Sequence, residues 1–194
     1  MRTQTPERGR RARLALPGAL IIGAQKSGTS ALAAYLAQHP RVLLAKQKEL
    51  EFFGSDLRYG YGLDWYADQW PDGSRRLIRL EASPQYMIVP RAAARIRCDL
   101  PEVRLIALVR DPAERAYSAW QMYRRQLAED PLFYRKLIGA HYTAEEAAAL
   151  VRRTAEELDD FWLAVRREAF CIERGETMEW SVVELGLYGP QLQR

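Results

Sequence analysis

The sequence predicts an α/β fold in which a central parallel sheet lies between layers of helices. Short apolar segments alternate with helical segments from residue 19 to residue 126, and turn-forming pairs such as His39-Pro40 and Ser83-Pro84 separate them. The first apolar segment, residues 19–24, reads Ala-Leu-Ile-Ile-Gly-Ala. Strands that alternate with helices form parallel sheets, and such strands read as apolar runs because both their faces are buried.

Each element follows from a local pattern. Strands are expected over residues 19–24, 42–45, 77–80 and 105–109, because these are short and mainly apolar. Helices are expected over residues 31–38, 90–99 and 112–126. Pro90 suits the first turn of its helix, and Asp111-Pro112 supplies an N-cap followed by a first-turn proline. Residues 144–170 are expected to be rich in helix, after the capping box Thr143-Ala-Glu-Glu146.

Composition indicates an ordinary globular protein and excludes several function classes. The chain has 194 residues, of which 48% are hydrophobic and 28% charged, with a net charge of +4. That surplus is too small to indicate nucleic-acid binding, and no apolar run is long enough for a membrane span. Cys98 and Cys171 are isolated and the histidines are His39 and His141, so a metal site is not expected. We therefore expect a soluble cytoplasmic protein.

The N-terminal residues differ from the rest in charge. Five arginines and one acid lie within the first thirteen residues. We expect residues 1–17 to form a disordered basic arm, and the alternative is a surface that attracts a polyanion. Residues 18–194 are expected to form one domain.

The turn after the first strand predicts an anion site. A buried strand leads into Gly23-Ala-Gln-Lys-Ser-Gly28, and a helix leaves from it. Such a turn directs backbone N–H groups and the helix N-terminus toward one anion, as in P-loop proteins. A nucleotide-hydrolysing P-loop has lysine directly after the second glycine, but Thr29 stands there and Lys26 lies inside the loop. The expected architecture is thus a three-layer, P-loop NTPase-like fold.

A second anion site is predicted after the strand at 105–109. Arg110 follows the carboxyl end of this strand, where open α/β sheets bind ligands, and Ser118 lies two turns into the next helix. A guanidinium and a hydroxyl together suit a phosphate monoester.

The two segments resemble the donor-binding motifs of the PAPS-dependent sulfotransferase family, in particular its heparan-sulfate-type and bacterial branch. PAPS is 3′-phosphoadenosine 5′-phosphosulfate, the sulfuryl donor of that family. The resemblance assigns the 3′-phosphate to Arg110 and Ser118. It assigns the 5′-phosphosulfate to Lys26, Ser27, Gly28, Thr29 and Ser30.

A third segment, Lys48-Glu-Leu-Glu-Phe-Phe53, resembles the family segment that carries the general base. The resemblance assigns the base to Glu49 in preference to Glu51. Apolar neighbours such as Phe52 are expected to raise its proton affinity. Ser83 is expected either to line the acceptor cleft or to pack in the core.

These features predict a sulfotransferase that transfers a sulfuryl group from PAPS to a hydroxyl or amine of a glycan or small molecule. Lys26 and Glu49 are the predicted catalytic residues, and no metal is expected. Two alternatives remain open: a P-loop nucleotide kinase with Asp111 as its metal-binding acid, and a non-catalytic remnant that binds PAP or another anion. The chain also resembles a family member without its C-terminal part.

Overall fold

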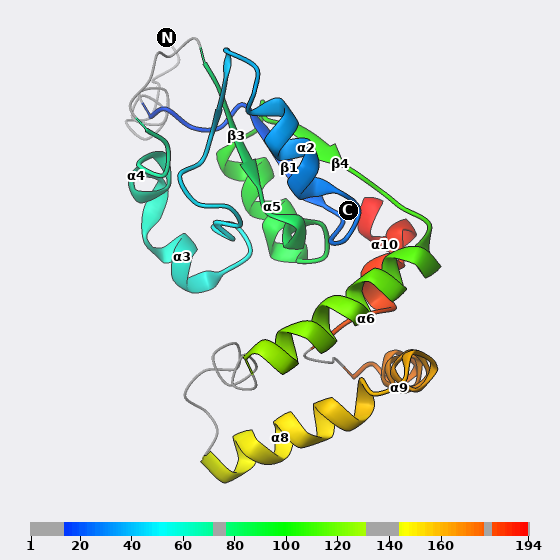
Figure 1. Ribbon diagram of the computed structural model, residues 1–194. Helices are drawn as coiled ribbons and strands as arrows, with labels where there is room; N and C mark the ends of the chain where they lie inside the picture. The colour runs from blue at the N-terminus through cyan, green and yellow to red at the C-terminus, as the bar shows by residue number, and fades with distance from the viewer. Residues whose placement is uncertain (1–13, 72–76, 131–143, 177–179, 194) are drawn as a thin grey trace, which may run out of the picture. The chain divides into compact units, whose positions relative to one another are not determined.

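The computed structural model describes residues 14–71, 77–130, 144–176 and 180–193 (Figure 1). Contacts divide the chain into two compact units, which we describe separately. The first unit runs to Val109 and includes the segment from Pro190 onward, and the second unit is Arg110–Gly189. The predicted basic arm lies mostly outside the described residues, and the single domain over 18–194 stays a prediction.

A four-stranded parallel sheet forms the centre of the first unit. Its strands are β1 (Ala19–Gly23), β2 (Val42–Leu44), β3 (Ile78–Ala82) and β4 (Arg104–Ala107), in the order β2-β3-β1-β4. All three strand pairs are parallel; Leu20, for example, lies opposite Glu81 on β3 and Leu105 on β4. The predicted parallel sheet is confirmed. Because β1 is an inner strand, its carboxyl end lies between those of β3 and β4.

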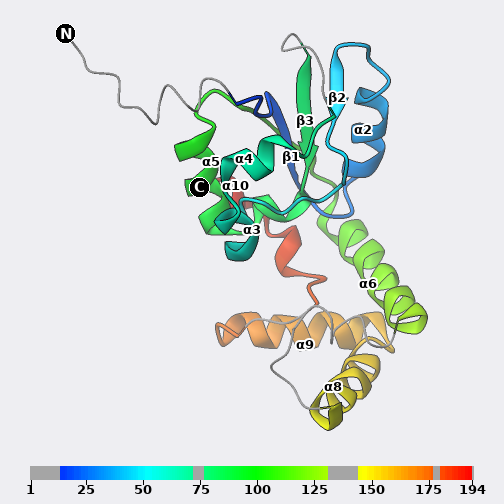
Figure 2. The same ribbon diagram turned by 90° about the vertical axis from the view of Figure 1, so that its left-hand side faces the viewer.

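Helices cover both faces of this sheet, as the sequence predicts. Helix α2 (Thr29–Leu36) lies on one side of the strands, and α3 (Asp56–Gly60), α4 (Gly62–Ala67) and α5 (Pro90–Asp99) lie on the other (Figure 2). Neighbouring residues on β1 show why: Ile21 packs with Ala33 of α2, whereas Leu20 packs with Ile96 of α5. Successive side chains of a strand point to opposite faces, so both helix layers are anchored on β1.

Strand β4 differs from its prediction. The sequence predicts a buried strand over 105–109, but β4 spans Arg104–Ala107 and Leu105 is 53% exposed. No further strand pairs with β4 among the described residues, and the side chain of Leu105 faces a cavity on one face of the sheet. Local sequence does not distinguish an inner strand from an apolar edge strand.

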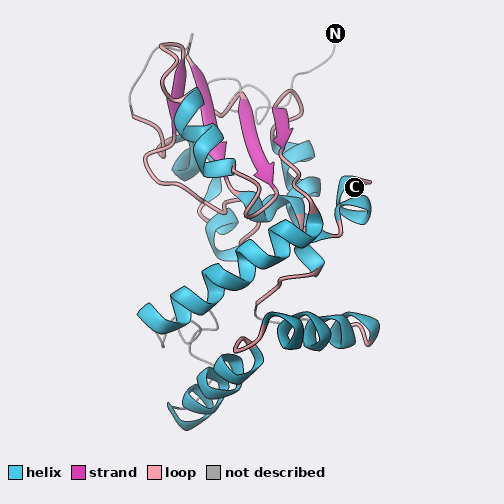
Figure 3. Cartoon of the chain, turned by 45° about the vertical axis from the view of Figure 1, so that its right-hand side comes forward, coloured by secondary structure: helices cyan, strands magenta, loops and turns pink. Residues whose placement is uncertain are grey.

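The second unit is helical. Its elements are α6 (Pro112–Glu129), α8 (Ala144–Glu157), α9 (Phe161–Glu173) and the 3₁₀ turn η2 (Glu184–Gly186), and α10 (Tyr188–Leu192) follows (Figure 3). Trp120, Leu158 and Trp180 pack in its core. The predicted cap of α6 is confirmed, since the Asp111 carboxylate accepts bonds from the N–H groups of Ala113 and Glu114 at 3.0 and 2.9 Å.

Candidate functional site

The loop of residues 24–28 joins β1 to α2 at the carboxyl edge of the sheet, where ligands of open α/β sheets bind. Two of its residues have left-handed backbone conformations, with φ of 68° at Lys26 and 94° at Gly28. Gly28 is the N-cap of α2 and has no side chain that could bond the first-turn N–H groups. An anion can supply that missing partner, because helix N-termini carry partial positive charge.

The start of the loop is fixed by close packing. The Gly23 carbonyl accepts a bond from the N–H of Leu108 at 2.8 Å, and the N–H of Ala24 donates to the Leu108 carbonyl at 2.7 Å. A β-carbon on residue 23 would lie 2.7 Å from Cβ of Met87. Only glycine therefore allows this approach of the turn η1 (Pro84–Met87) to β1.

The hydroxyl side chains of the loop and of the first turn of α2 lie in different surroundings. Ser27 Oγ is buried and has no hydrogen-bond partner among the described residues. Thr29 is buried at the start of α2. Ser30 Oγ accepts a 2.6 Å bond from Nζ of Lys48. Ser30 thus connects the first turn of α2 to the segment that carries the predicted base.

Glu49, the predicted base, lies in the segment after β2 with its backbone held from two sides. Its N–H donates to the Ala82 carbonyl at 3.1 Å, and its carbonyl accepts from Nη1 of Arg58 at 3.1 Å. Its side chain is 48% exposed and its Oε1 lies 2.9 Å from Nζ of Lys48. The expected apolar surroundings are therefore absent at Glu49, because the neighbouring Phe52 points into the core and the carboxylate points outward.

Glu51 is the carboxyl group that this segment buries. The pKa of Glu51 is raised to about 7, mainly by burial and also by the nearby charges of Glu81 and Glu49, while Arg58 acts in the opposite direction. Glu51 Oε1 has no hydrogen-bond partner among the described residues. Its backbone N–H donates to Ser83 Oγ at 3.1 Å.

A buried hydroxyl network surrounds Glu81. The hydroxyl groups of Ser83 and Tyr86 donate to Glu81 Oε1 at 2.6 Å each, and the Tyr66 hydroxyl donates to Oε2. Glu81 is fully buried, and burial raises its pKa although the three hydroxyl bonds lower it. Ser83 is thus a core residue that links Glu81 to the backbone of Glu51. Sequence reasoning missed this network; a carboxylate with a serine two residues later and a tyrosine five residues later was its signal.

The second predicted anion site belongs to the second unit. Arg110 pairs with Glu114, four residues on, with Nε and Nη2 at 3.0 and 2.9 Å from Glu114 Oε2. The N–H of Arg110 donates to the Tyr188 hydroxyl at 3.4 Å. Ser118 is half-buried in the second turn of α6. Tyr188 is a neighbour of Arg110 that sequence reasoning did not find, because 78 residues separate them.

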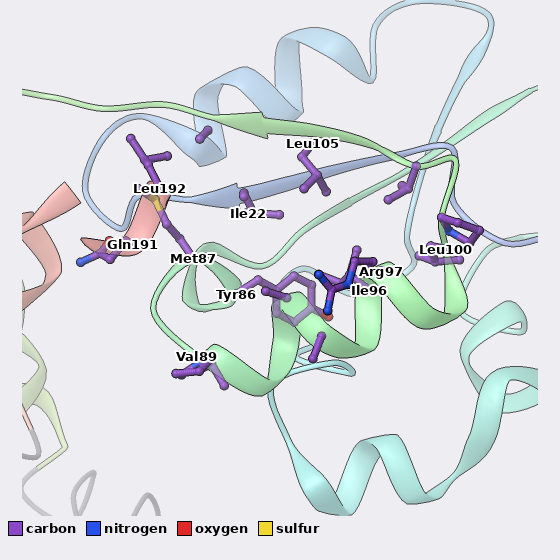
Figure 4. Close-up of a pocket in the computed structure, with 16 residues that line it drawn as sticks. Ile22, Tyr86, Met87, Val89, Ile96, Arg97, Leu100, Leu105, Gln191 and Leu192 are labelled. Carbon is purple, nitrogen blue, oxygen red and sulfur yellow. The ribbon is translucent and has the colours of Figure 1, made fainter. Parts of the chain in front are cut away.

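A large cavity of the first unit borders the hydroxyl network, because Tyr86 is one of its lining residues. Its volume is about 820 Å³, and its walls come mainly from α5 and from the segment that continues into β4. Ile22 and Leu105 lie on the strands and Ile96 and Arg97 on the helix (Figure 4). None of the predicted site residues lines it, and its lining is largely apolar. It does not suit a phosphosulfate.

Within the described residues, no group of three or more acidic, histidine or cysteine side chains could hold a metal ion. No helix in that part of the chain is long and apolar enough to cross a bilayer.

A sequence model of the sulfotransferase domain matches residues 16–178. The chain belongs to this family. The sulfotransferase domain is 41% identical over 103 residues to human heparan sulfate glucosamine 3-O-sulfotransferase 5, covering 53% of this chain and 30% of that protein. It is 34% identical over 178 residues to mouse heparan sulfate glucosamine 3-O-sulfotransferase 3B1, covering 92% of this chain and 37% of that protein.

A solved structure has the same fold. The sulfotransferase from Alicyclobacillus acidocaldarius superimposes with a TM-score of 0.59 at 24% identity, over 91% of this chain and 66% of that one. Together these findings confirm the predicted family and α/β fold. The sulfotransferase domain spans about a third of the length of the two curated relatives, 30% and 37%.

Proposed function

We propose that this sulfotransferase domain transfers a sulfuryl group from PAPS to a hydroxyl or amine of a glycan or small-molecule acceptor. The observation that carries the proposal is the loop of residues 24–28, which places Lys26 in a left-handed turn directly before a helix capped by glycine. Membership of the sulfotransferase family supports the same donor. Nothing in the comparisons favours a kinase.

The fit of the donor to the first unit rests on charge and hydrogen-bonding capacity. A 5′-phosphosulfate presents several anionic oxygens, and the start of α2 offers N–H groups that Gly28 leaves uncapped by a side chain. The buried hydroxyl of Ser27 lacks a partner among the described residues, so it can accept or donate one more bond. Lys26 would stabilise the charge that develops on the departing phosphate.

The proposed reaction is an in-line displacement at sulfur. A bond forms between sulfur and the acceptor oxygen or nitrogen, and the bond from sulfur to the bridging oxygen breaks with its electron pair leaving on the 5′-phosphate of PAP. Glu49 accepts the proton that the acceptor loses. Its outward-pointing carboxylate suits this role, because an acceptor can reach it from solvent. The rate acceleration comes from positioning of the reactants and from electrostatic stabilisation of the transition state, as in phosphoryl transfer.

In the second unit, Arg110 and Ser118 are proposed to bind the 3′-phosphate. Arg110 presents a planar guanidinium that suits a phosphate, and in the structure this group pairs with Glu114 of α6. Among the possible acceptors, we favour a glycan that contains glucosamine, because two similar proteins are named as heparan sulfate glucosamine 3-O-sulfotransferases. The cytoplasmic location predicted from the sequence stays a prediction.

Titration calorimetry tests the donor. The chain should bind PAP in EDTA, and Lys26→Met and Arg110→Met should each weaken that binding about tenfold or more. Binding of ATP with Mg²⁺ but not of PAP would overturn the proposal.

Transfer is tested by incubation with labelled PAPS and N-desulfated heparan, with Glu49→Gln as the inactive control. A chain that binds PAP but transfers nothing would support the non-catalytic alternative.

A further inference from the structure

The ammonium group of Lys48 connects the first turn of α2 to Glu49, the predicted base. Nζ of Lys48 lies 2.6 Å from Ser30 Oγ and 2.9 Å from Glu49 Oε1. Ser30 belongs to the first turn of α2, one residue after Thr29, so it lies beside the proposed site of the 5′-phosphosulfate. Lys48 therefore forms an ion pair with one carboxylate oxygen of Glu49 and also lies beside the proposed donor site.

The contact between Lys48 and Glu49 is exchangeable. Their side chains are 43% and 48% exposed, and ion pairs of that exposure are weak because water screens them. An anion with several charges near Ser30 would compete strongly for the same ammonium. The lysine stem is flexible, so the ammonium can change partner by rotating its side-chain bonds.

The backbone around this contact is held more firmly than the side chains. The N–H of Glu49 is bonded to Ala82 of β3, and the carbonyls of Glu49 and Leu50 both accept from Arg58. A change in this region is thus expected to occur in the Lys48 side chain and not in the path of the loop. Arg58 is engaged by two backbone carbonyls, whereas Lys48 contacts two exposed side chains, those of Ser30 and Glu49.

We propose that Lys48 couples donor binding to the release of Glu49. With the loop empty, its ammonium occupies Glu49 Oε1. When the phosphosulfate binds beside Ser30, the ammonium turns to the sulfuryl oxygens, and the freed carboxylate oxygen accepts the proton of the acceptor. The inference rests on the proposed function, since it requires PAPS at residues 26–30.

A double-mutant cycle in donor binding tests the coupling without requiring turnover. PAPS affinity is measured without acceptor for the wild type, Lys48→Met, Glu49→Gln and the double variant. Glu49→Gln should tighten PAPS binding about threefold to fivefold in the wild-type background, because a competitor for Lys48 is removed. In the Lys48→Met background the same substitution should change the affinity less than 1.5-fold.

Two comparisons separate this role from a general effect of charge. Lys48→Met should weaken PAPS binding about fivefold more than PAP binding, because PAP lacks the sulfuryl group, and Lys48→Arg should restore most of the loss. Lys46→Met is the matched control: Lys46 precedes Lys48 by two residues, is exposed, and bonds the Asp68 carbonyl at 2.9 Å. It should leave both affinities unchanged.

Two outcomes would overturn the inference while the proposed function stands. One is an equal effect of Glu49→Gln in both backgrounds, and the other is an equal loss of PAP and PAPS affinity in Lys48→Met. If the wild-type chain binds neither PAP nor PAPS, the proposed function fails first, and the coupling with it.

Discussion

Glu51 is a largely buried carboxyl group whose ionised form is repelled by the negative charges of Glu81 and Glu49. Its pKa of about 7 in the folded chain exceeds the ordinary value of 4.5. The folded state therefore holds this proton more tightly than the unfolded state does. Its stabilising contribution is complete below pH 4.5 and is lost as the pH rises through 7.

We accordingly expect the free energy of unfolding to fall between pH 5 and pH 8, with Glu51 contributing at most about 3 kcal/mol. Glu51→Gln should reduce this slope and leave the variant more stable than the wild type at pH 8 by about 1–2 kcal/mol. Urea unfolding at several pH values measures both quantities. Glu102→Gln, at an exposed turn, is the control; a slope in Glu51→Gln as steep as in the wild type would refute the assignment.

Glu114 competes with any phosphate for the guanidinium of Arg110. The pair is exposed, with side chains 41% and 64% accessible, so its strength is on the order of 0.2–1 kcal/mol. Glu114→Gln should therefore tighten PAP binding about twofold to fivefold, which calorimetry can detect. Glu129→Gln, exposed at the other end of α6, should have no effect. Weaker binding in Glu114→Gln would instead mean that Glu114 orients Arg110 for the ligand.

At the scale of elements, the carboxylate of Glu168 on α9 organises the segment that leads to Tyr188. It accepts bonds from the N–H groups of Val182, Val183 and Glu184 at 2.6, 2.7 and 3.0 Å, and from Ser181 Oγ at 2.7 Å. Glu168 is 1% exposed. It thus caps the turn η2 with one buried charge.

Glu168→Ala should destabilise the second unit by about 3 kcal/mol, because three backbone N–H groups would lose their partner in a buried place. Urea unfolding followed by circular dichroism measures the loss of helix. Glu173→Ala, exposed on the same helix, serves as the control and should stay within about 0.5 kcal/mol of the wild type. Equal stability of the two variants would mean that water replaces the carboxylate.

Elements with a strong local signal were predictable. Helix α5 runs over Pro90–Asp99 as expected, because a first-turn proline marks its beginning. Helix α3 (Asp56–Gly60) was missed because five residues are too few to show helical periodicity. Its N-cap is Ser55, a residue type that sequence analysis associates with the start of a helix, and the Ser55 side chain accepts a bond from the Arg58 N–H.

At the scale of the whole molecule, the sequence located the glycine-rich turn between β1 and α2 but not the burial of the carboxyl groups. Strand, glycine-rich turn and helix are contiguous, so the loop around Lys26 could be predicted from spacing alone. Which of Glu49 and Glu51 is buried depends on left-handed backbone at both residues, with φ of 59° and 51°, and on contacts with β3. Tyr66 and Glu81 are brought together by the packing of α4 on the sheet, and no local pattern encodes that.

The edge strand β4 leads to a prediction about the association of the chain. Among the described residues β4 pairs on one side only, and its Leu105 is 53% exposed. An apolar edge strand is a template for pairing with another chain. The chain should therefore self-associate as its concentration rises, and light scattering after size exclusion can follow this.

Leu105→Lys should lower that self-association, because a charged side chain on an edge strand opposes pairing with another chain. Leu57→Lys is the matched control, since Leu57 is 70% exposed on α3 and distant from the strands in sequence. If both variants associate like the wild type, the contact between copies uses another surface. If both associate less, apolar exposure in general drives the association, and the free edge of β4 has no special part in it.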